Sequence, residues 1–333
     1  MREWLYEAGI GEARAALIDD GRIIAAAIEA DDDGPRAGTV APARLTRIVI
    51  PGRRAIVTLD SGHEALIEPV PAGVTQGARL MIEIGRAALP EPGRAKLAIA
   101  RVAPPGSEPA SGPDLAARIA ATADAVRTEP VHGPDRLEAA GWSELIEEAA
   151  TGACDFEGGS LRLSLTPAMT LIDVDGWLPL ADLAVAGAAA AAQMIVRHDI
   201  GGSIGIDLPT VESKAARLAA AAAIDSILPQ SFERTAVNGF GFIQIIRRRV
   251  RASLPERIQG DPVIAAARAL LRRAERTPGA GARTISAAPR VIAAIEHRVD
   301  WQVELARRVG APIVLRADPA LAISAGHVDA QNP

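Results

Sequence analysis

The stretch Leu171-Ile172-Asp173-Val174-Asp175-Gly176 decides the fold of this chain, together with the later stretch Ile204-Gly205-Ile206-Asp207. Each contains a short apolar run with aspartate at or near its end, which is typical of a buried strand that is leaving its sheet. An Ala-rich helical pattern over 183–197 lies between them, and Gly201-Gly202 ends it. The order strand, helix, strand predicts a parallel pair with a right-handed crossover. An α/β layer is therefore expected in this part of the chain.

Parallel neighbours would bring Asp173 and Asp207 to the same carboxyl edge of the sheet, where open α/β sheets bind ligands. Two carboxylates at one place repel each other unless a cation neutralises them. Magnesium suits such a place, because it takes one or two carboxylates and completes its shell with water and phosphate oxygens. Asp173 and Asp207 are thus candidate metal ligands for Mg²⁺. The alternative that they are turn and cap aspartates stays open, since such residues are common after strands.

Upstream of this layer the pattern predicts β structure. Apolar runs at 13–18 and 22–29 flank Asp19-Asp20-Gly21, a strong hairpin signal. Between 38 and 103, turn residues such as Pro92-Gly93 separate short apolar runs and predict a small barrel of the OB type. The runs are Leu45–Ile50, Ala55–Leu59, Ala65–Ile67, Arg79–Ile84 and Ala95–Val102. A Pro/Gly-rich linker is expected at 104–113, followed by helices at 114–126 and 134–150.

Downstream, the pattern predicts a helix at Val211–Leu228, a strand at Phe240–Ile246 and a basic helical stretch at 247–276. The tail predicts a strand, a helix at Pro289–Gly310 and a strand at Pro312–Arg316. The expected divisions are an N-terminal hairpin packing on the core (1–35), a barrel (36–103), a linker with a helical remnant (104–150), a catalytic layer (151–254), a helical linker (255–280) and a small C-terminal domain (281–333).

Composition limits the classes of function. The net charge of −5 gives no overall attraction to nucleic acid, so any RNA contact must come from local basic patches. The single cysteine, Cys154, excludes an intrachain disulfide and a Cys-rich zinc site, and favours a reducing compartment. Met1-Arg2-Glu3-Trp4 does not resemble a signal peptide, and the Ala-rich run 183–196 is shorter than the roughly 20 residues of a membrane span. A cytoplasmic protein with no membrane partner is expected.

Several motifs follow one another in the order found in the ribonuclease E/G family. Leu171–Gly176, Arg197-His198-Asp199-Ile200-Gly201-Gly202 and Ile204–Asp207 resemble the catalytic core of that family. Gly239-Phe240-Gly241 and the Arg-rich stretch Arg247–Leu254 resemble its Arg-Phe-Gly strand and its Arg-rich helix ending in Ser-Leu. The similarity covers most of the chain and is strongest over 165–254.

The resemblance implies a fold and an activity. The fold would be an S1-like OB barrel, a DNase I-like α/β catalytic layer and a small C-terminal α/β domain. The activity would be magnesium-dependent endonucleolytic cleavage of single-stranded RNA, with Asp173, Asp175 and Asp207 as catalytic residues. Residues 231–276 form a basic cluster, with ten arginines against four acidic residues. Phosphate contact is one interpretation of this cluster, and a solvated helix face is the other. The arginines expected to contact RNA are Arg247, Arg248, Arg249 and Arg251.

Departures from the family keep a second hypothesis open, namely an RNA-binding or regulatory protein that no longer cleaves RNA. The family's asparagine is Asp175 here, and its arginine before Phe-Gly is Gly239. The region that senses a 5′ monophosphate in the family is largely missing between 104 and 165. The expected barrel has no aromatic residue, because none lies between Tyr6 and Trp142. Stacking of bases on aromatic rings is worth about 1–3 kcal/mol per base, so its loss there would weaken RNA binding.

The family's two-cysteine zinc link between subunits is replaced by 255–261, so any homodimer must form without zinc. An apolar stripe within 261–273 could form such an interface or could pack on its own domain, as most amphipathic helices do. His198 is expected to be a histidine at a helix end rather than a general base. Cys154 is expected to be a small buried residue rather than a nucleophile.

Overall fold

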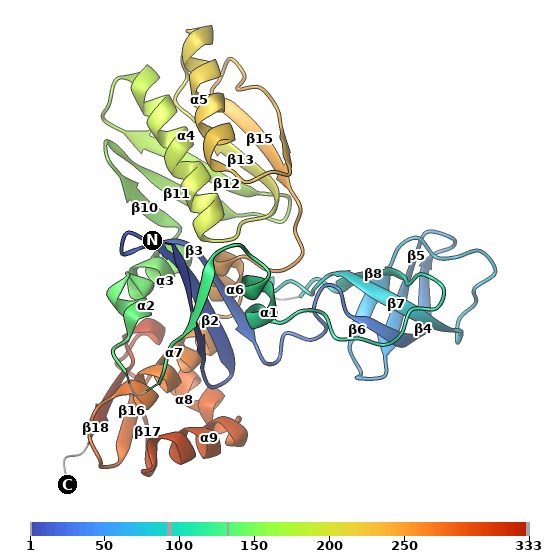
Figure 1. The fold of residues 1–333 in the computed structure, drawn as a ribbon, viewed down its shortest axis with the longest axis vertical. Coiled ribbons are helices and arrows are strands. Elements are labelled where there is room, and N and C mark those ends of the chain that lie inside the picture. The colour runs from blue at the N-terminus through green and yellow to red at the C-terminus, as the bar shows by residue number, and fades with distance from the viewer. Residues whose placement is uncertain (1, 92–94, 132, 331–333) are drawn as a thin grey trace.

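The computed structural model describes residues 2–91, 95–131 and 133–330. An N-terminal sheet lies at the centre of the molecule, with a barrel projecting to one side, an α/β layer above it and a small α/β unit below (Figure 1). The predicted class, α/β and β with several domains and a closed barrel, is confirmed at this level.

The central sheet has the strand order β3-β2-β1-β9. Its strands are β1 (Glu3–Ala8), β2 (Glu12–Asp19), β3 (Arg22–Ala30) and β9 (Ala125–Thr128). The predicted hairpin is β2 and β3, joined through Asp20 and Gly21, both with positive φ. One face of the sheet packs on helices α2 (Arg136–Ala139) and α3 (Trp142–Thr151), and the other packs on α1 (Leu115–Ala120).

The barrel closes in the order β4-β5-β6-β8-β7. Its strands are β4 (Val40–Ile50), β5 (Arg54–Leu59), β6 (Glu64–Ile67), β7 (Arg79–Arg86) and β8 (Ala98–Val102), which correspond to the predicted apolar runs. Small aliphatic side chains such as Leu45, Val57 and Ile82 fill its interior. Closure leaves no free sheet edge, and the architecture is consistent with an OB-like barrel. The predicted turn at Pro92-Gly93 lies outside the described residues.

The α/β layer contains the strand order β10-β11-β12-β13-β15-β14. Its elements are β10 (Ala153–Phe156), β11 (Gly159–Leu165), β12 (Thr170–Gly176), α4 (Leu180–Arg197), β13 (Gly202–Asp207), α5 (Lys214–Ile227), β14 (Phe232–Arg234) and β15 (Phe242–Arg247). Strands β12 and β13 are parallel neighbours joined through α4, so the predicted parallel pair is confirmed. Helices α4 and α5 lie together on one face of the sheet (Figure 1).

Side-chain alternation explains why only one face is covered. Ile172, Val174, Ile204 and Ile206 are buried against the helices, and the intervening residues point to the opposite face. The helix approaches closely because a Cβ at Gly187 would lie 2.3 Å from Val174 Cγ1. By length and composition alone α4 could cross a membrane, but core helices pass the same test, and α4 contributes much of the apolar core of this layer.

The C-terminal unit contains the strand order β17-β16-β18. It follows α6 (Leu254–Gly260) and comprises α7 (Pro262–Arg276), β16 (Arg283–Ala287), α8 (Pro289–Glu296), α9 (Val299–Val309), β17 (Ile313–Ala317), a short 3₁₀ turn (Ile323–Ala325) and β18 (His327–Ala330). The apolar stripe of α7 is used here, since Ala267, Leu270 and Leu271 are buried in this core. The stripe therefore packs on its own domain, which was one of the two interpretations. The segment 255–280, which was expected to be a linker, packs as part of two cores.

Several predicted helices are wrong in extent, for local reasons. The helix predicted over 114–126 ends at Ala120, and residues 125–128 instead form β9 beside β1, a strand that was not predicted. The helix over 134–150 breaks at Gly141, which has a φ of +96° that helices do not adopt. The basic stretch 247–276 begins in β15 and turns before α6, and the helix over 289–310 breaks between α8 and α9.

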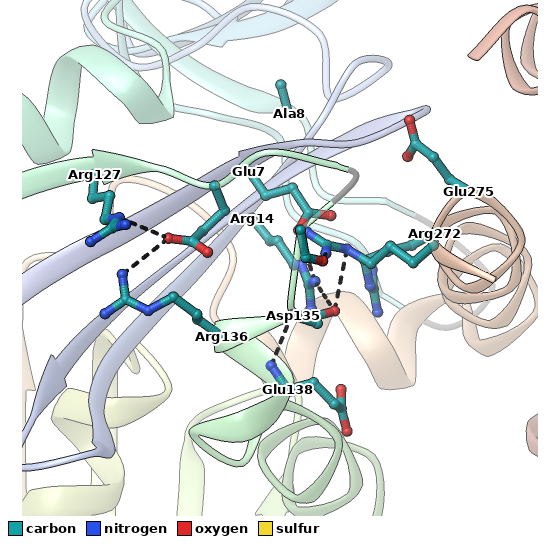
Figure 2. A network of polar contacts seen from close by, with 12 residues as sticks. Glu7, Ala8, Arg14, Arg127, Asp135, Arg136, Glu138, Arg272 and Glu275 are labelled. Atoms are coloured by element: carbon teal, nitrogen blue, oxygen red, sulfur yellow. Dashed lines mark hydrogen bonds and ion pairs between the residues drawn. The ribbon is translucent and has the colours of Figure 1, made fainter. Parts of the chain in front are cut away.

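Buried ion pairs join the central sheet to the helices beneath it (Figure 2). Arg14 on β2 is 1% exposed, and its Nη2 lies 2.9 Å from Glu7 Oε2 and 2.8 Å from Asp135 Oδ2. Arg276 on α7 pairs with the same two carboxylates. The guanidinium carbon of Arg14 also lies 5.0 Å from the centroid of the Trp142 ring. This cluster ties β1, β2, α2 and α7 together.

Candidate active site

Asp173 and Asp207 are directly paired in the register of the parallel strands β12 and β13. Neighbouring strands lie about 4.8 Å apart, so both carboxylates rise side by side from the same face of the sheet. That face is opposite to the one covered by α4 and α5, and both aspartates are exposed. The sequence prediction that these two residues meet at one edge is thus confirmed as a strand register.

Asp175 lies two residues further along β12 and therefore projects on the same face. On the other side, strand β11 places Arg162 opposite Asp173 and Ser160 opposite Asp175. Arg162 is exposed. The open face thus carries a row of polar side chains from three strands, with two aspartates on β12, one on β13 and a single arginine on β11.

The negative charges of these aspartates repel one another. The pKa of Asp173 is raised by desolvation, and the negative charges of Asp175 and Asp207 raise it further. Repulsion of this kind is what a bound cation would relieve. Among the described residues, no group of three or more His, Cys, Asp or Glu side chains is gathered as a metal site. A pair of carboxylate ligands still fits magnesium, which keeps several waters and takes few protein ligands.

The surface below the aspartates is shaped by a glycine. A Cβ at Gly205 would lie 2.6 Å from the Phe242 ring and 2.9 Å from Leu171 Cδ2, so the ring rests directly on the β13 backbone. Further along the same face, Gln244 Nε2 donates a hydrogen bond to Ser203 Oγ over 3.0 Å. The open face is consequently a fixed surface across β12, β13 and β15.

Three of the four arginines expected to contact RNA have partners within the protein. Arg247 Nη1 donates to Ile200 O over 2.6 Å, and burial lowers the pKa of this guanidinium. Arg251 Nε lies 2.7 Å from Asp199 Oδ2, and Arg249 pairs with Glu256. Arg248 is exposed, and within the described part of the chain its side chain forms no hydrogen bond or ion pair. The basic cluster is therefore mainly structural rather than a freely solvated face.

A cleft of about 410 Å³ lies between the barrel and the opposite end of the sheet from the aspartates. It is lined by Lys96 from the barrel side, by Thr170 and Ser203 at the starts of β12 and β13, and by Arg249. A second hollow of about 550 Å³ covers the outer face of the barrel and includes Arg47, Arg54, Arg86 and Lys96. Glu91 and Lys96 line both hollows, so the two lie next to each other.

His198 and Cys154 are buried away from the aspartates, as expected for structural residues. His198 is the C-cap residue of α4 and is fully buried, with its Nε2 3.2 Å from Glu148 Oε2. Burial lowers the pKa of its imidazole. Burial also raises the pKa of the Cys154 thiol, although Arg197 Nη2 lies 3.0 Å from its sulfur. A thiol held protonated in this way is a poor nucleophile.

In comparison with known proteins, no protein-family model and no curated protein matches the chain.

The end of the sheet that carries Asp173, Asp175 and Asp207 is called the acidic edge below. Sequence reasoning missed three residues at this acidic edge. Arg162 could have been found from the alternation of polar and apolar residues in β11. Trp177 and Phe240 are 79% and 82% exposed, and their positions beside the aspartate stretches were the available signal.

Proposed function

We propose that this chain is a magnesium-dependent endoribonuclease that cleaves phosphodiesters of single-stranded RNA in the cytoplasm. The observation that carries the proposal is the pairing of Asp173 with Asp207 on an open sheet face. Within the described part of the chain neither carboxylate forms an ion pair, although Arg162 lies opposite Asp173 in the register. Protein scaffolds seldom keep such repulsion without use, and perturbed groups cluster at functional sites. The resemblance to the ribonuclease E/G family supplies the reaction class.

In this proposal Asp173 and Asp207 hold the cation and Asp175 lies close to it. Bound magnesium would supply a Lewis acid that activates water and stabilises negative charge on the phosphodiester. Arg162, opposite Asp173, is placed to attract a phosphate oxygen and orient the backbone at the acidic edge. The proposed S1-like barrel and DNase I-like layer would bind parts of the strand away from the cleaved bond, with Arg54 in the hollow of the barrel face and the exposed Arg248 as backbone contacts.

The test compares Asp173→Asn with Asp155→Asn, which changes an exposed carboxylate on β10 of the same sheet. A single-stranded RNA labelled at one end is incubated with each protein and magnesium, with and without chelator. Loss of a metal ligand should remove several kcal/mol of transition-state stabilisation, so we expect Asp173→Asn to lower cleavage more than about a hundredfold. Asp155→Asn should cleave like the wild type. Equal cleavage by wild type and Asp173→Asn would refute the assignment.

A second candidate function is RNA binding without cleavage. Two observations favour it: Asp175 stands where the family has asparagine, and the described residues lack a cluster of three metal-binding side chains. The same assay separates the two candidates. Fragments that disappear with chelator support the nuclease, whereas a mobility shift without fragments supports the binding protein.

A further inference from the structure

The acidic edge is flanked by two exposed aromatic rings. Trp177 follows β12 directly after the aspartate stretch, and Phe240 precedes β15, whose first residue is paired with Asp207. Both β12 and β15 pair with β13, so the two rings leave the same end of the sheet on either side of Asp207. Two strand spacings, roughly 10 Å, separate the strands from which they emerge.

These rings are exceptional within the chain. The sequence contains nine aromatic residues, four Trp, four Phe and one Tyr, and all nine lie in the described residues. Trp177 and Phe240 are the exposed ones, whereas Trp4, Trp142 and Trp301 are buried and the other four are half-buried. Side chains this exposed bury little surface on folding, so the two rings gain little stability from the core.

The backbone beneath each ring is fixed. The Trp177 amide donates to Gly158 O over 3.1 Å. Phe240 N donates to Asn238 Oδ1 over 2.9 Å, and Phe240 O accepts from Thr210 Oγ1 over 3.1 Å. The next residue is Gly241, with φ of +92°, where a Cβ would lie 2.1 Å from Leu208 O. Rings on anchored backbone lose little entropy when a planar ligand stacks on them.

The barrel, unlike the acidic edge, has no aromatic ring on which a base could stack. Single-strand binding proteins combine a backbone-tracking groove with aromatic rings on which bases stack. We infer that Trp177 and Phe240 are the stacking platforms of this chain, each taking one nucleobase of a single strand whose intervening phosphate lies over Asp173 and Asp207. This inference rests on the proposed function and names how its substrate is positioned. The protein should therefore prefer single strands to duplexes, because the bases of a duplex are already stacked on one another.

Tryptophan fluorescence gives a direct readout, because Trp177 is the exposed tryptophan and the other three are buried. Calcium replaces magnesium throughout, so that a divalent cation offsets the charge of Asp173 and Asp207 while binding is measured, and a gel verifies that the RNA stays intact. The probes are an oligoadenylate of roughly ten nucleotides and an abasic ribose-phosphate chain of the same length. We expect the oligoadenylate, and not the abasic chain, to quench the emission of the wild type.

Three variants complete the experiment: Trp177→Leu, Phe240→Leu and, as a control, Val303→Ala at an exposed position of α9. Trp177→Leu should abolish the quench, and each ring variant should weaken oligoadenylate binding about tenfold in a mobility-shift assay. Val303→Ala should bind like the wild type.

The outcomes are distinguishable from failure of the proposed function. If the wild type cleaves RNA but both ring variants bind and cleave equally well, the nuclease stands and the stacking inference is overturned. Equal binding of the abasic chain would overturn it too. Light scattering compares the particle masses of the wild type and Trp177→Leu. If the mass of the variant is lower, the rings form a contact between copies of the chain, and the inference is likewise overturned.

Discussion

Carboxylates at the centre of the molecule and carboxylates at the edge of the α/β layer are held in opposite ways. Glu7 on β1 and Asp135 at the start of α2 lie on the face of the central sheet next to that helix, where Arg14 pairs with both of them (Figure 2). Arg276 pairs with the same two carboxylates. Arg14 lowers the pKa of Asp135, although burial opposes that effect. At the sheet edge, Asp173 lies beside Asp207 and its pKa is raised.

The difference separates scaffold from site. Burial of a charge is costly, so a scaffold pairs each carboxylate with a cation already present in the chain. A site that takes a cation from solution must leave its carboxylates unpaired and accept their repulsion. The arginine-rich segment at the opposite end of the sheet follows the first pattern, since Arg247, Arg249 and Arg251 have partners within the protein.

The largest effect should come from breaking the buried network with Arg14→Met. Removal of Arg14 leaves two carboxylates, Glu7 and Asp135, to share the single guanidinium of Arg276, and we expect the free energy of unfolding to fall by roughly 3–5 kcal/mol. Urea titration followed by tryptophan fluorescence measures it. Arg2→Met is the control, because Arg2 is 52% exposed, its Nε lies 3.5 Å from Asp124 Oδ1, and such a pair contributes less than about 1 kcal/mol. Equal effects of the two variants would contradict the comparison.

A smaller effect should come from His198, a buried group whose imidazole is kept neutral. Glu148 and Arg197 are the charged groups that face it, and burial lowers its pKa. In the unfolded chain the imidazole takes a proton below about pH 6.5, whereas the folded imidazole resists it. The free energy of unfolding should therefore fall as pH decreases below about 6.5, by up to about 1.4 kcal/mol per pH unit.

Glu148 affects a different range of pH. Its pKa is lowered by its hydrogen bond with His198 and by Arg197, although burial opposes this, so its contribution is lost only below its usual pKa near 4.5. Urea titrations between about pH 7.5 and 5 thus isolate the histidine. His198→Gln should flatten the dependence, and His297→Gln at an exposed helix end should retain it. A wild-type slope in His198→Gln would show that another group titrates.

Sequence reasoning found the parts of this comparison that depend on local pattern. Alternation and the ends of apolar runs predicted β12, α4 and β13, and these alone brought Asp173 to Asp207. The barrel strands followed from turn residues. Strand β9 was missed because its four residues are all exposed and its only signal is a parallel pairing with β1, more than a hundred residues earlier.

The partners of charged side chains could not be predicted from the sequence. Arg276 meets Glu7 across 269 positions, and Arg268 meets Asp32 across 236. Such pairings depend on how α7 docks under the central sheet, which periodicity does not specify. For the same reason the sequence does not indicate that three of the arginines in 247–251 have partners within the protein, and their contact with RNA stays a prediction.

The smallest expected effect is a change in the free energy of unfolding whose sign differs between two exposed aspartates. Asp173→Asn removes a repulsion, whereas Asp225→Asn removes the attraction to Arg234, whose Nε donates to Asp225 Oδ1 over 2.6 Å and whose hydrogen bond lowers the pKa of that carboxyl. Both groups are largely exposed, so each change should stay below about 1 kcal/mol. In chelator at low salt, we expect the free energy of unfolding to rise in Asp173→Asn and to fall in Asp225→Asn. Raising the salt concentration to about 1 M should shrink both differences, because the Debye length then falls to about 3 Å and even close exposed charges are screened. If Asp173→Asn destabilises the chain as Asp225→Asn does, Asp173 has a stabilising partner within the fold, and its carboxylate belongs with the scaffold rather than with a cation site.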